Sequence, residues 1–212
     1  MKKVFGFILC LLAGSAHAGV ILGPTAVDVS ATDTSIYGSN NNSLIDQSGL
    51  SANYISGVTD FAAFTSTSTA HYDTTLTNLG LGGVAELGSF YFDLGSLFNV
   101  DGVATWGQDC CSATLLSYDL YASDAFGAAG TRELIGRFSA GTTPNAYAHT
   151  FSAVTTRFLE IDVIANSGYP YATRLNEVVF GGSVTGVPEA PALLLMLMAL
   201  AGFGGLRLRK NS

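Results

Sequence analysis

The sequence predicts an all-β protein, an antiparallel sandwich or barrel, placed between two targeting segments. Three observations support this fold class. Apolar and polar residues alternate with period two in several runs, which is typical of strands with one buried face. Good helix formers are scarce in the central part, and no segment there has a convincing 3.6-residue apolar stripe. Clusters of Gly, Asn, Asp and Pro separate the runs at short intervals.

The first 18 residues have the organisation of a secretory signal peptide. Lys2-Lys3 form a basic n-region, Val4 to Ala13 form an apolar h-region, and Ala16-His17-Ala18 is an A-x-A site. Cleavage is expected before Gly19, so the mature protein is expected to be exported.

The central part, residues 19–186, is long enough for one domain with a well-buried core. It carries fifteen Asp and Glu residues against four Arg and no Lys, a net charge of −11. A domain this acidic repels nucleic acid and anionic lipid headgroups. DNA or RNA binding is therefore not expected.

The alternation of apolar and polar residues is less regular before residue 85 than after it. Residues 20–29 are expected to hold one strand, and residues 33–49 are polar and expected to form a loop. The Ser/Thr run at residues 65–69 is expected to be an exposed loop, and the Gly-rich stretch 79–83 a flexible connector.

After residue 85 the strands follow one another closely. Alternation is clearest around Leu120 and Ile161, and Asp101-Gly102 is expected to separate two strands. No internal repeat and no second domain boundary is present in the sequence. The seven predicted strands are Ser89–Leu94, Val100–Trp106, Leu115–Ser123, Glu133–Phe138, Ala146–Phe151, Thr156–Ile164 and Arg174–Phe180.

Four of these segments carry a family resemblance. They are Phe90 to Gly95, Leu120 to Asp124, Thr156 to Ile161 and Asn176 to Phe180, in this order. Together they resemble the discoidin or F5/8 type C family, whose members are galactose-binding-like jelly rolls. The resemblance covers about residues 20–182 and implies an antiparallel β-sandwich. The sequence departs from the family in the segment Thr156 to Ile161. The family motif there contains two arginines, and the second of them is replaced by Leu159 or Glu160, depending on the alignment.

The resemblance also implies a metal site. Many galactose-binding-like modules hold a structural calcium where the first loop meets the last strand. Asp46 and Glu177 occupy the matching places in this sequence, and ligation by oxygen alone suits calcium. Two other roles stay open, because Asp46 could cap a turn and Glu177 could pair with Arg174.

Ligands of this family bind in loops at one end of the sandwich. A sugar needs an aromatic platform and charged hydrogen-bonding groups, because a pyranose has an apolar face and a polar rim. Each aromatic candidate could instead belong to the core, and the arginine could only anchor a loop. The two tyrosines that flank Pro170, Tyr169 and Tyr171, are the strongest candidates for such an aromatic platform. The candidate ligand-binding residues are Tyr54, Trp106, Asp109, Arg157, Tyr169 and Tyr171, with Phe61 as a further aromatic.

No catalytic centre is expected. His71 and His149 are the two histidines of the central part, and the sequence has no zinc-protease, P-loop or dinucleotide motif. The segment Gly136 to Gly141 has one residue too many before Ser139 for a nucleophile elbow. A hydrolase is therefore disfavoured.

Cys110-Cys111 is the one cysteine pair that remains after signal cleavage. In an oxidising compartment, adjacent cysteines can close a strained eight-membered disulfide ring. Free or intermolecular thiols are the alternative. A metal site is poorly supported, because two thiolates need further ligands and none is nearby in sequence.

The C-terminal segment, residues 187–212, begins with Pro188-Glu189, continues with the apolar stretch Ala192–Leu206 and ends in a basic cluster. This order resembles the PEP-CTERM sorting signal of Gram-negative bacteria, although Ala190 replaces its second proline. The resemblance implies export, transient anchoring in the inner membrane and processing by an exosortase-type membrane protease. A plain anchor that is never cut is the alternative. The apolar stretch is short for a bilayer span of about 20 residues.

Together these features predict an exported, non-enzymatic protein of the cell surface or extracellular matrix, whose partner is a glycan or exopolysaccharide. The alternative is a purely structural envelope or matrix protein without a defined ligand.

Overall fold

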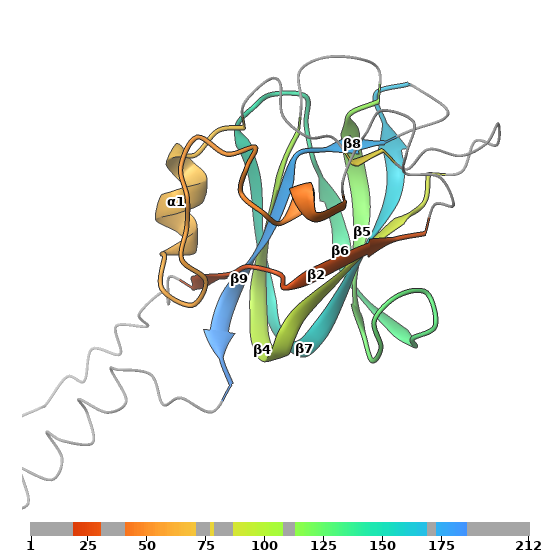
Figure 1. Ribbon diagram of the computed structural model, residues 1–212. Helices are drawn as coiled ribbons and strands as arrows, with labels where there is room; N and C mark the ends of the chain where they lie inside the picture. The colour runs from red at the N-terminus through yellow and green to blue at the C-terminus, as the bar shows by residue number, and fades with distance from the viewer. Residues whose placement is uncertain are drawn as a thin grey trace, which may run out of the picture.

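The computed structural model of the chain is an antiparallel β-sandwich with one α-helix on its side (Figure 1). It describes residues 19–30, 41–70, 77–78, 87–107, 113–168 and 173–185. The fold class predicted from the sequence is confirmed. The expected signal peptide, residues 1–18, and the C-terminal segment, residues 187–212, lie outside the described residues.

All strand pairs in the described part of the chain are antiparallel, and two short helices precede the long strands. The helices are η1 (Asn41–Leu44) and α1 (Phe61–Thr67). The strands are β1 (Val20–Leu22), β2 (Ala26–Val29), β3 (Thr77–Asn78), β4 (Ser89–Trp106), β5 (Leu115–Ser123), β6 (Arg132–Ser139), β7 (Ala146–Asn166), β8 (Arg174–Leu175) and β9 (Glu177–Val184).

The two long strands, β4 and β7, take part in both layers of the sandwich. The first half of β4 pairs with β2, and its second half pairs with β9, while β7 pairs with both halves. A register shift between Asp93 and Phe98 separates the halves. Such an irregularity bends a strand. One layer contains β2, β5 and β6, the other contains β1 and β9, and the bent strands β4 and β7 connect the two layers.

The main core lies between these layers. It takes alternate residues of each strand, because successive side chains of a strand point to opposite faces. Phe92 of β4 and Phe180 of β9 meet edge to face, with ring centroids 5.4 Å apart. The fully buried side chains include Phe90, Phe92, Leu115, Tyr118, Leu120, Leu159, Ile161 and Phe180.

A second hydrophobic cluster covers the opposite face of β4 and β9. Ala104, Trp106 and Val179 point to this face, where residues 50–70 lie over them. Phe64 of α1 packs edge to face on Trp106, at 6.2 Å between centroids, and Tyr54 packs on Phe64 at 5.7 Å. The β9 sheet layer is therefore buried on both faces.

Helix α1 contradicts the expectation of an exposed loop at residues 65–69, because the helix includes residues 65–67. Asp60 caps it by accepting a hydrogen bond from the Ala63 N–H at 2.7 Å. Within the helix, the Thr65 hydroxyl donates to the Phe61 carbonyl at 2.9 Å. The Phe61 ring lies against the backbone of Gly181. Burial of this apolar side stabilises a helix that low propensity alone disfavours.

Several predicted strand boundaries need correction. Residues 20–29 form two strands, β1 and β2, instead of one. The predicted break at Asp101-Gly102 is a register shift inside the continuous strand β4. Strand β4 also continues through the break predicted at residues 94–100, and β7 continues through the break predicted between residues 151 and 156. Leu115–Ser123 is confirmed without change as β5. Turn-type residues inside a long strand allow it to bend without ending it.

Candidate functional site

Glu177 is the first residue of β9, and its side chain is completely buried. It pairs in register with Trp106 of β4. Both side chains point away from the main core, because Val178 lies in the main core and Val179 in the second cluster. The sheet therefore carries a carboxyl group into an apolar layer.

Neither carboxyl oxygen of Glu177 has a hydrogen-bond partner. Burial raises the pKa of Glu177 to about 9, and the nearby charge of Asp46 contributes to the rise. The Gln47 backbone N–H faces the carboxyl group and lowers its pKa slightly, but does not reach hydrogen-bond geometry. Unpartnered buried carboxyls are costly, so such a group calls for a compensating ligand or proton.

The loop after η1 brings Asp46 towards Glu177. Asp46 is exposed, and its Oδ1 accepts a hydrogen bond from the Ser48 N–H at 2.9 Å. Gln47 has a φ of 64°, which places it in the left-handed region, and its Oε1 accepts from the Tyr54 N–H at 2.7 Å. Asp46 thus stabilises a turn, one of the two roles left open by the sequence, while it also faces Glu177.

These residues fit a calcium ion in their chemistry. Calcium takes six to eight oxygen ligands from carboxylates, backbone carbonyls and water. Asp46 and Glu177 would supply carboxylates, and backbone carbonyls of the loop after η1 would have to supply further ligands. In the described part of the chain no three His, Cys, Asp or Glu residues gather in a group. A cation here would therefore depend on carbonyl oxygens for most of its ligands.

Two of the predicted sugar-binding aromatics belong to the second cluster. Trp106 has no exposed surface, and its Nε1–H donates to the Ser68 carbonyl at 3.3 Å. Tyr54 is 7% exposed, and burial, together with the charges of Glu177 and Asp46, raises the pKa of its hydroxyl. Phe61 is buried beside them. A ring without an exposed face cannot stack on a sugar, which corrects the expectation for these three residues.

Arg157 is held by Asp93 of β4 in a two-point contact. Its Nε and one terminal nitrogen donate to the two carboxyl oxygens at 2.7 and 2.9 Å. These hydrogen bonds hold the pKa of Asp93 below its usual range. The pair joins β4 to β7 at the point where both strands bend. The anchoring role that the sequence left open for Arg157 is therefore the one its contacts support.

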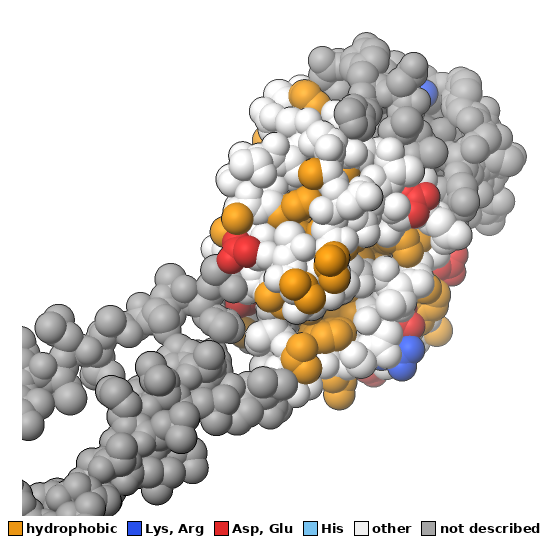
Figure 2. Space-filling model, turned by 60° about the vertical axis from the view of Figure 1, so that its left-hand side comes forward, with side chains coloured by type: hydrophobic (Ala, Val, Ile, Leu, Met, Phe, Trp, Pro, Cys, Tyr) orange, Lys and Arg blue, Asp and Glu red, His pale blue; other side chains and the backbone are white. Residues whose placement is uncertain are grey.

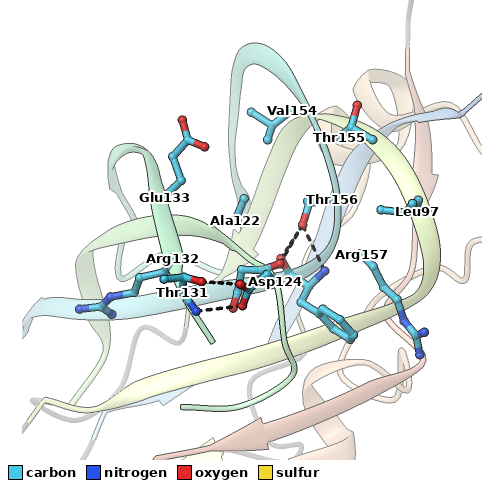
Figure 3. A pocket seen from close by; sticks show the side chains of 12 residues that line it. Leu97, Ala122, Asp124, Thr131, Arg132, Glu133, Val154, Thr155, Thr156 and Arg157 are labelled. Carbon is cyan, nitrogen blue, oxygen red and sulfur yellow. Dashed lines mark hydrogen bonds between the residues drawn. The ribbon is translucent and has the colours of Figure 1, made fainter. Parts of the chain in front are cut away.

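Arg157 also lines a surface groove of about 660 Å³ at this bend (Figure 3). Several of its polar side chains are held by hydrogen bonds, either within the groove or to neighbouring strands. Arg132 donates to Glu160 at 2.6 Å, and the Thr131 hydroxyl donates to Asp124. Figure 3 shows Arg132 and Arg157 pointing to opposite sides of the groove.

At the opposite end of the sandwich, hydrogen bonds hold two loop entrances side by side. The Thr114 N–H donates to the Ser167 hydroxyl at 3.0 Å, and the Ser167 N–H donates back to the Thr114 carbonyl at 2.9 Å. The Arg174 N–H donates to the Ala113 carbonyl at 2.7 Å. Residues 108–112 and 169–172 are therefore flanked by neighbouring strand ends.

Several predicted residues fall in these two stretches. Asp109, Cys110-Cys111, Tyr169 and Tyr171 lie outside the described residues, as do Pro188 and Glu189 of the sorting motif. The sequence did not single out Thr114 and Ser167, which connect the two loop entrances. Small hydroxyl residues at strand ends are common, and only the pairing of β5 with β7 shows that these two meet.

No family model and no curated protein matches the chain. Solved structures do match. The chain is 18% identical to a chitosan-binding module from a chitosanase/glucanase of Paenibacillus sp. IK-5, with a TM-score of 0.53, over 76% of this chain and 98% of that one. It is 10% identical to a family 32 carbohydrate-binding module from Clostridium perfringens in complex with GalNAc-β-1,3-galactose, with a TM-score of 0.54, over 74% and 94% of the two chains.

The chain has the fold of a carbohydrate-binding module. A third match, to a family 89 glycoside hydrolase from Clostridium perfringens, has a TM-score of 0.52 and 18% identity, and covers 81% of this chain but 16% of that enzyme. The galactose-binding-like sandwich predicted from the strand motifs is thereby confirmed. At sequence identities of 10–18%, the similarity between this chain and the three solved structures shows a shared fold.

Proposed function

We propose that this protein is an exported, non-enzymatic carbohydrate-binding module whose ligand is an extracellular glycan or exopolysaccharide. The observation that supports this function is the shared fold with modules solved in complex with sugars. In the described part of the chain, the pairing of the charged groups is structural, since Arg132, Arg137 and Arg157 each pair with a carboxylate. That pairing agrees with a binding protein more than with an enzyme.

The sugar site is proposed at the end of the sandwich where residues 108–112 and 169–172 leave the strands. Asp109, Tyr169 and Tyr171 belong to these stretches. The hydrogen bonds between Thr114 and Ser167 place both loop entrances at one point. Two tyrosines and a carboxylate from these loops supply an aromatic platform and a hydrogen-bond acceptor for a pyranose.

A glycan array on the purified protein, followed by calorimetry on any sugar found, tests this site. Tyr169→Ala is expected to weaken binding about tenfold, because loss of one stacking aromatic costs roughly 1.5 kcal/mol. Tyr121→Ala is the matched control, because Tyr121 lies on a part of the sheet away from the proposed sugar site. The Arg132 guanidinium carbon lies over the Tyr121 ring, 4.3 Å from the ring centroid. An array without any signal contradicts the proposal and leaves the structural envelope protein as the better interpretation.

A structural calcium ion is proposed as the partner of Glu177 and Asp46. The unpartnered carboxyl of Glu177 supports this assignment. When bound, the ion supplies the positive charge that makes an ionised carboxylate tolerable in an apolar layer. With the ion bound, both residues would fix the start of β9 relative to the loop after η1.

Calorimetric titration of the protein with calcium tests this site. We expect binding by the wild type, and no heat from an Asp46→Ala variant. Glu133→Gln serves as the control, because Glu133 is an exposed carboxylate of β6. Absence of heat from the wild type contradicts the assignment.

We further propose that the signal peptide exports the chain and that the C-terminal segment anchors it transiently in the inner membrane, where an exosortase-type protease processes it. The motif around Pro188-Glu189 and the basic cluster after Leu206 support this route. Cell fractionation combined with the mass of the mature C-terminus tests it. A full-length polypeptide in the cytosol, with both ends intact, contradicts it.

A further inference from the structure

Most of the exposed large hydrophobic side chains gather at one end of the sandwich. Six such side chains occur among the described residues, and four of them are Ile55 (66% exposed), Val58 (69%), Leu97 (57%) and Val184 (45%). We call this group the apolar end. Isolated exposed hydrophobic residues are common, but several at one end of a domain suggest a contact surface.

Backbone contacts link these four residues to strands β1 and β9, the first and last strands of the domain. Val184 pairs with Phe98, the residue after Leu97, and the Thr185 hydroxyl donates to the Leu97 carbonyl at 3.1 Å. The loop that carries Ile55 and Val58 runs beside β1. Its contacts are the bonds from Gly57 N–H to Ile21 O and from Ile21 N–H to Thr59 O, both 2.8 Å. The start of β1, the end of β9 and the bend of β4 lie towards the lower end of Figure 1.

The sequence places an apolar stretch close to the same end. Six residues, 186–191, separate Thr185 from Ala192, the first residue of the 15-residue stretch to Leu206. Extended chain of this length spans at most about 25 Å. A bilayer that holds the stretch is therefore within about 25 Å of Thr185, the residue after Val184.

The charges of this end argue against attraction to an anionic membrane surface. Arg132 and Arg157, which line the groove beside Leu97, are each ion-paired with a carboxylate, and the exposed carboxylates Asp124 and Glu133 line the same groove. The domain as a whole carries fifteen acids against four arginines. Figure 2 shows few charged side chains among the hydrophobic ones on the face beside α1. Attraction to anionic headgroups is therefore not the basis of the contact.

We propose that the apolar end rests on the bilayer in which the C-terminal segment is anchored, with Leu97, Val184, Val58 and Ile55 at the hydrocarbon boundary. This inference rests on the anchoring step of the proposed function. Such a contact orients the domain. Trp106 lies nine residues from Leu97 along β4, about 30 Å at 3.3 Å per residue. The strand ends that lead into the loops proposed to bind sugar therefore lie on the far side of the domain from the membrane while the protein is tethered.

The test uses the full-length protein in phosphatidylcholine vesicles whose acyl chains carry bromine, a contact quencher of tryptophan. In Leu97→Trp, the emission gained over wild type is expected to be lost in these vesicles. Ser139→Trp is the control, because Ser139 is exposed at the far end of β6, where it pairs with Ser117 near the start of β5, and its gained emission is expected to be retained. The native Trp106 is fully buried and serves as an unquenched reference in both variants.

Three outcomes overturn the inference. Vesicles that float without the protein show that the anchoring step itself is wrong. Vesicles that carry the protein but quench the tryptophans at positions 97 and 139 equally, or neither of them, leave the anchor intact and refute the contact. A blue-shifted, unquenched emission from position 97 shows that a second copy or the chain's own tail covers the apolar end. Val184→Trp repeats the measurement if Leu97→Trp does not fold.

Discussion

Glu177 illustrates how a single buried group makes the stability of a domain depend on pH. Its carboxyl lies at the first position of β9, under the loop of Asp46, without a hydrogen-bond partner. Because burial raises its pKa to about 9, the folded protein retains a proton there that the unfolded chain releases near pH 4.5. Without a cation, the folded state therefore binds one more proton than the unfolded state between these two pH values.

This difference predicts a fall in stability on the alkaline side. In chelator, the contribution of Glu177 is complete below pH 4.5 and declines as the pH rises towards 9, by up to about 1.4 kcal/mol per pH unit. Denaturant unfolding of the wild type at several pH values measures the slope. Glu177→Gln is expected to remove it, whereas Glu133→Gln on the exposed strand β6 retains it. An equal slope in wild type and Glu177→Gln contradicts this account.

Trp106 shows that an aromatic residue typical of sugar sites can serve the core. It fills the second cluster between Phe64 and the sheet, with its ring nitrogen bonded to Ser68. Trp106→Ala is expected to destabilise the domain by about 3–5 kcal/mol, the usual cost of removing a large buried ring. Thermal unfolding measures this loss. A variant of wild-type stability that has lost only sugar binding shows that the ring serves the ligand site.

At the scale of elements, the packing of α1 on the sheet depends on two positions of β4 and β9 that have no side chain. Gly102 and Gly181 pair across β4 and β9, and the Phe61 ring occupies the space that side chains would fill. A Cβ on Gly181 would lie 2.8 Å from the ring of Phe61, which is too close. Two glycines in paired strands thus allow a helix to pack directly on a sheet backbone.

Gly181→Ala is therefore expected to destabilise the domain by about 1–3 kcal/mol through overpacking. The smaller side chain of Phe61→Leu is expected to restore part of this loss, so that the double variant is more stable than the sum of the single changes predicts. A double-mutant cycle from urea unfolding measures this coupling. Strict additivity shows that the contact between the helix and Gly181 carries no energy of its own.

For the whole molecule, the two hydrophobic clusters share the same strands. Val178 and Phe180 of β9 point into the main core, while Val179 points into the second cluster. Because β4 and β9 bury side chains of both clusters, unfolding of these strands would expose both clusters at once. The arrangement of layers therefore couples residues 50–70 to the sandwich, and α1 does not form a separate unit.

One cooperative unfolding transition is expected as a result. Fluorescence of Trp106 reports on the second cluster, and far-ultraviolet circular dichroism reports on the sheets. In urea the two signals are expected to change with the same midpoint. An earlier fluorescence midpoint means that the helical layer detaches before the sandwich unfolds.

The sequence by itself determined the all-β class, the jelly-roll resemblance and most strand positions after residue 85, because period-two burial is a local property of each strand. The family resemblance also singled out Asp46 and Glu177, whose charges interact in the structure, while the calcium ion assigned to them stays a prediction. The tertiary structure alone decided that Trp106 and Tyr54 are core residues, that residues 61–67 form a helix and that Arg157 pairs with Asp93. Each of these outcomes depends on which distant segment covers a given face, and contacts between distant segments leave no periodic signal in the chain.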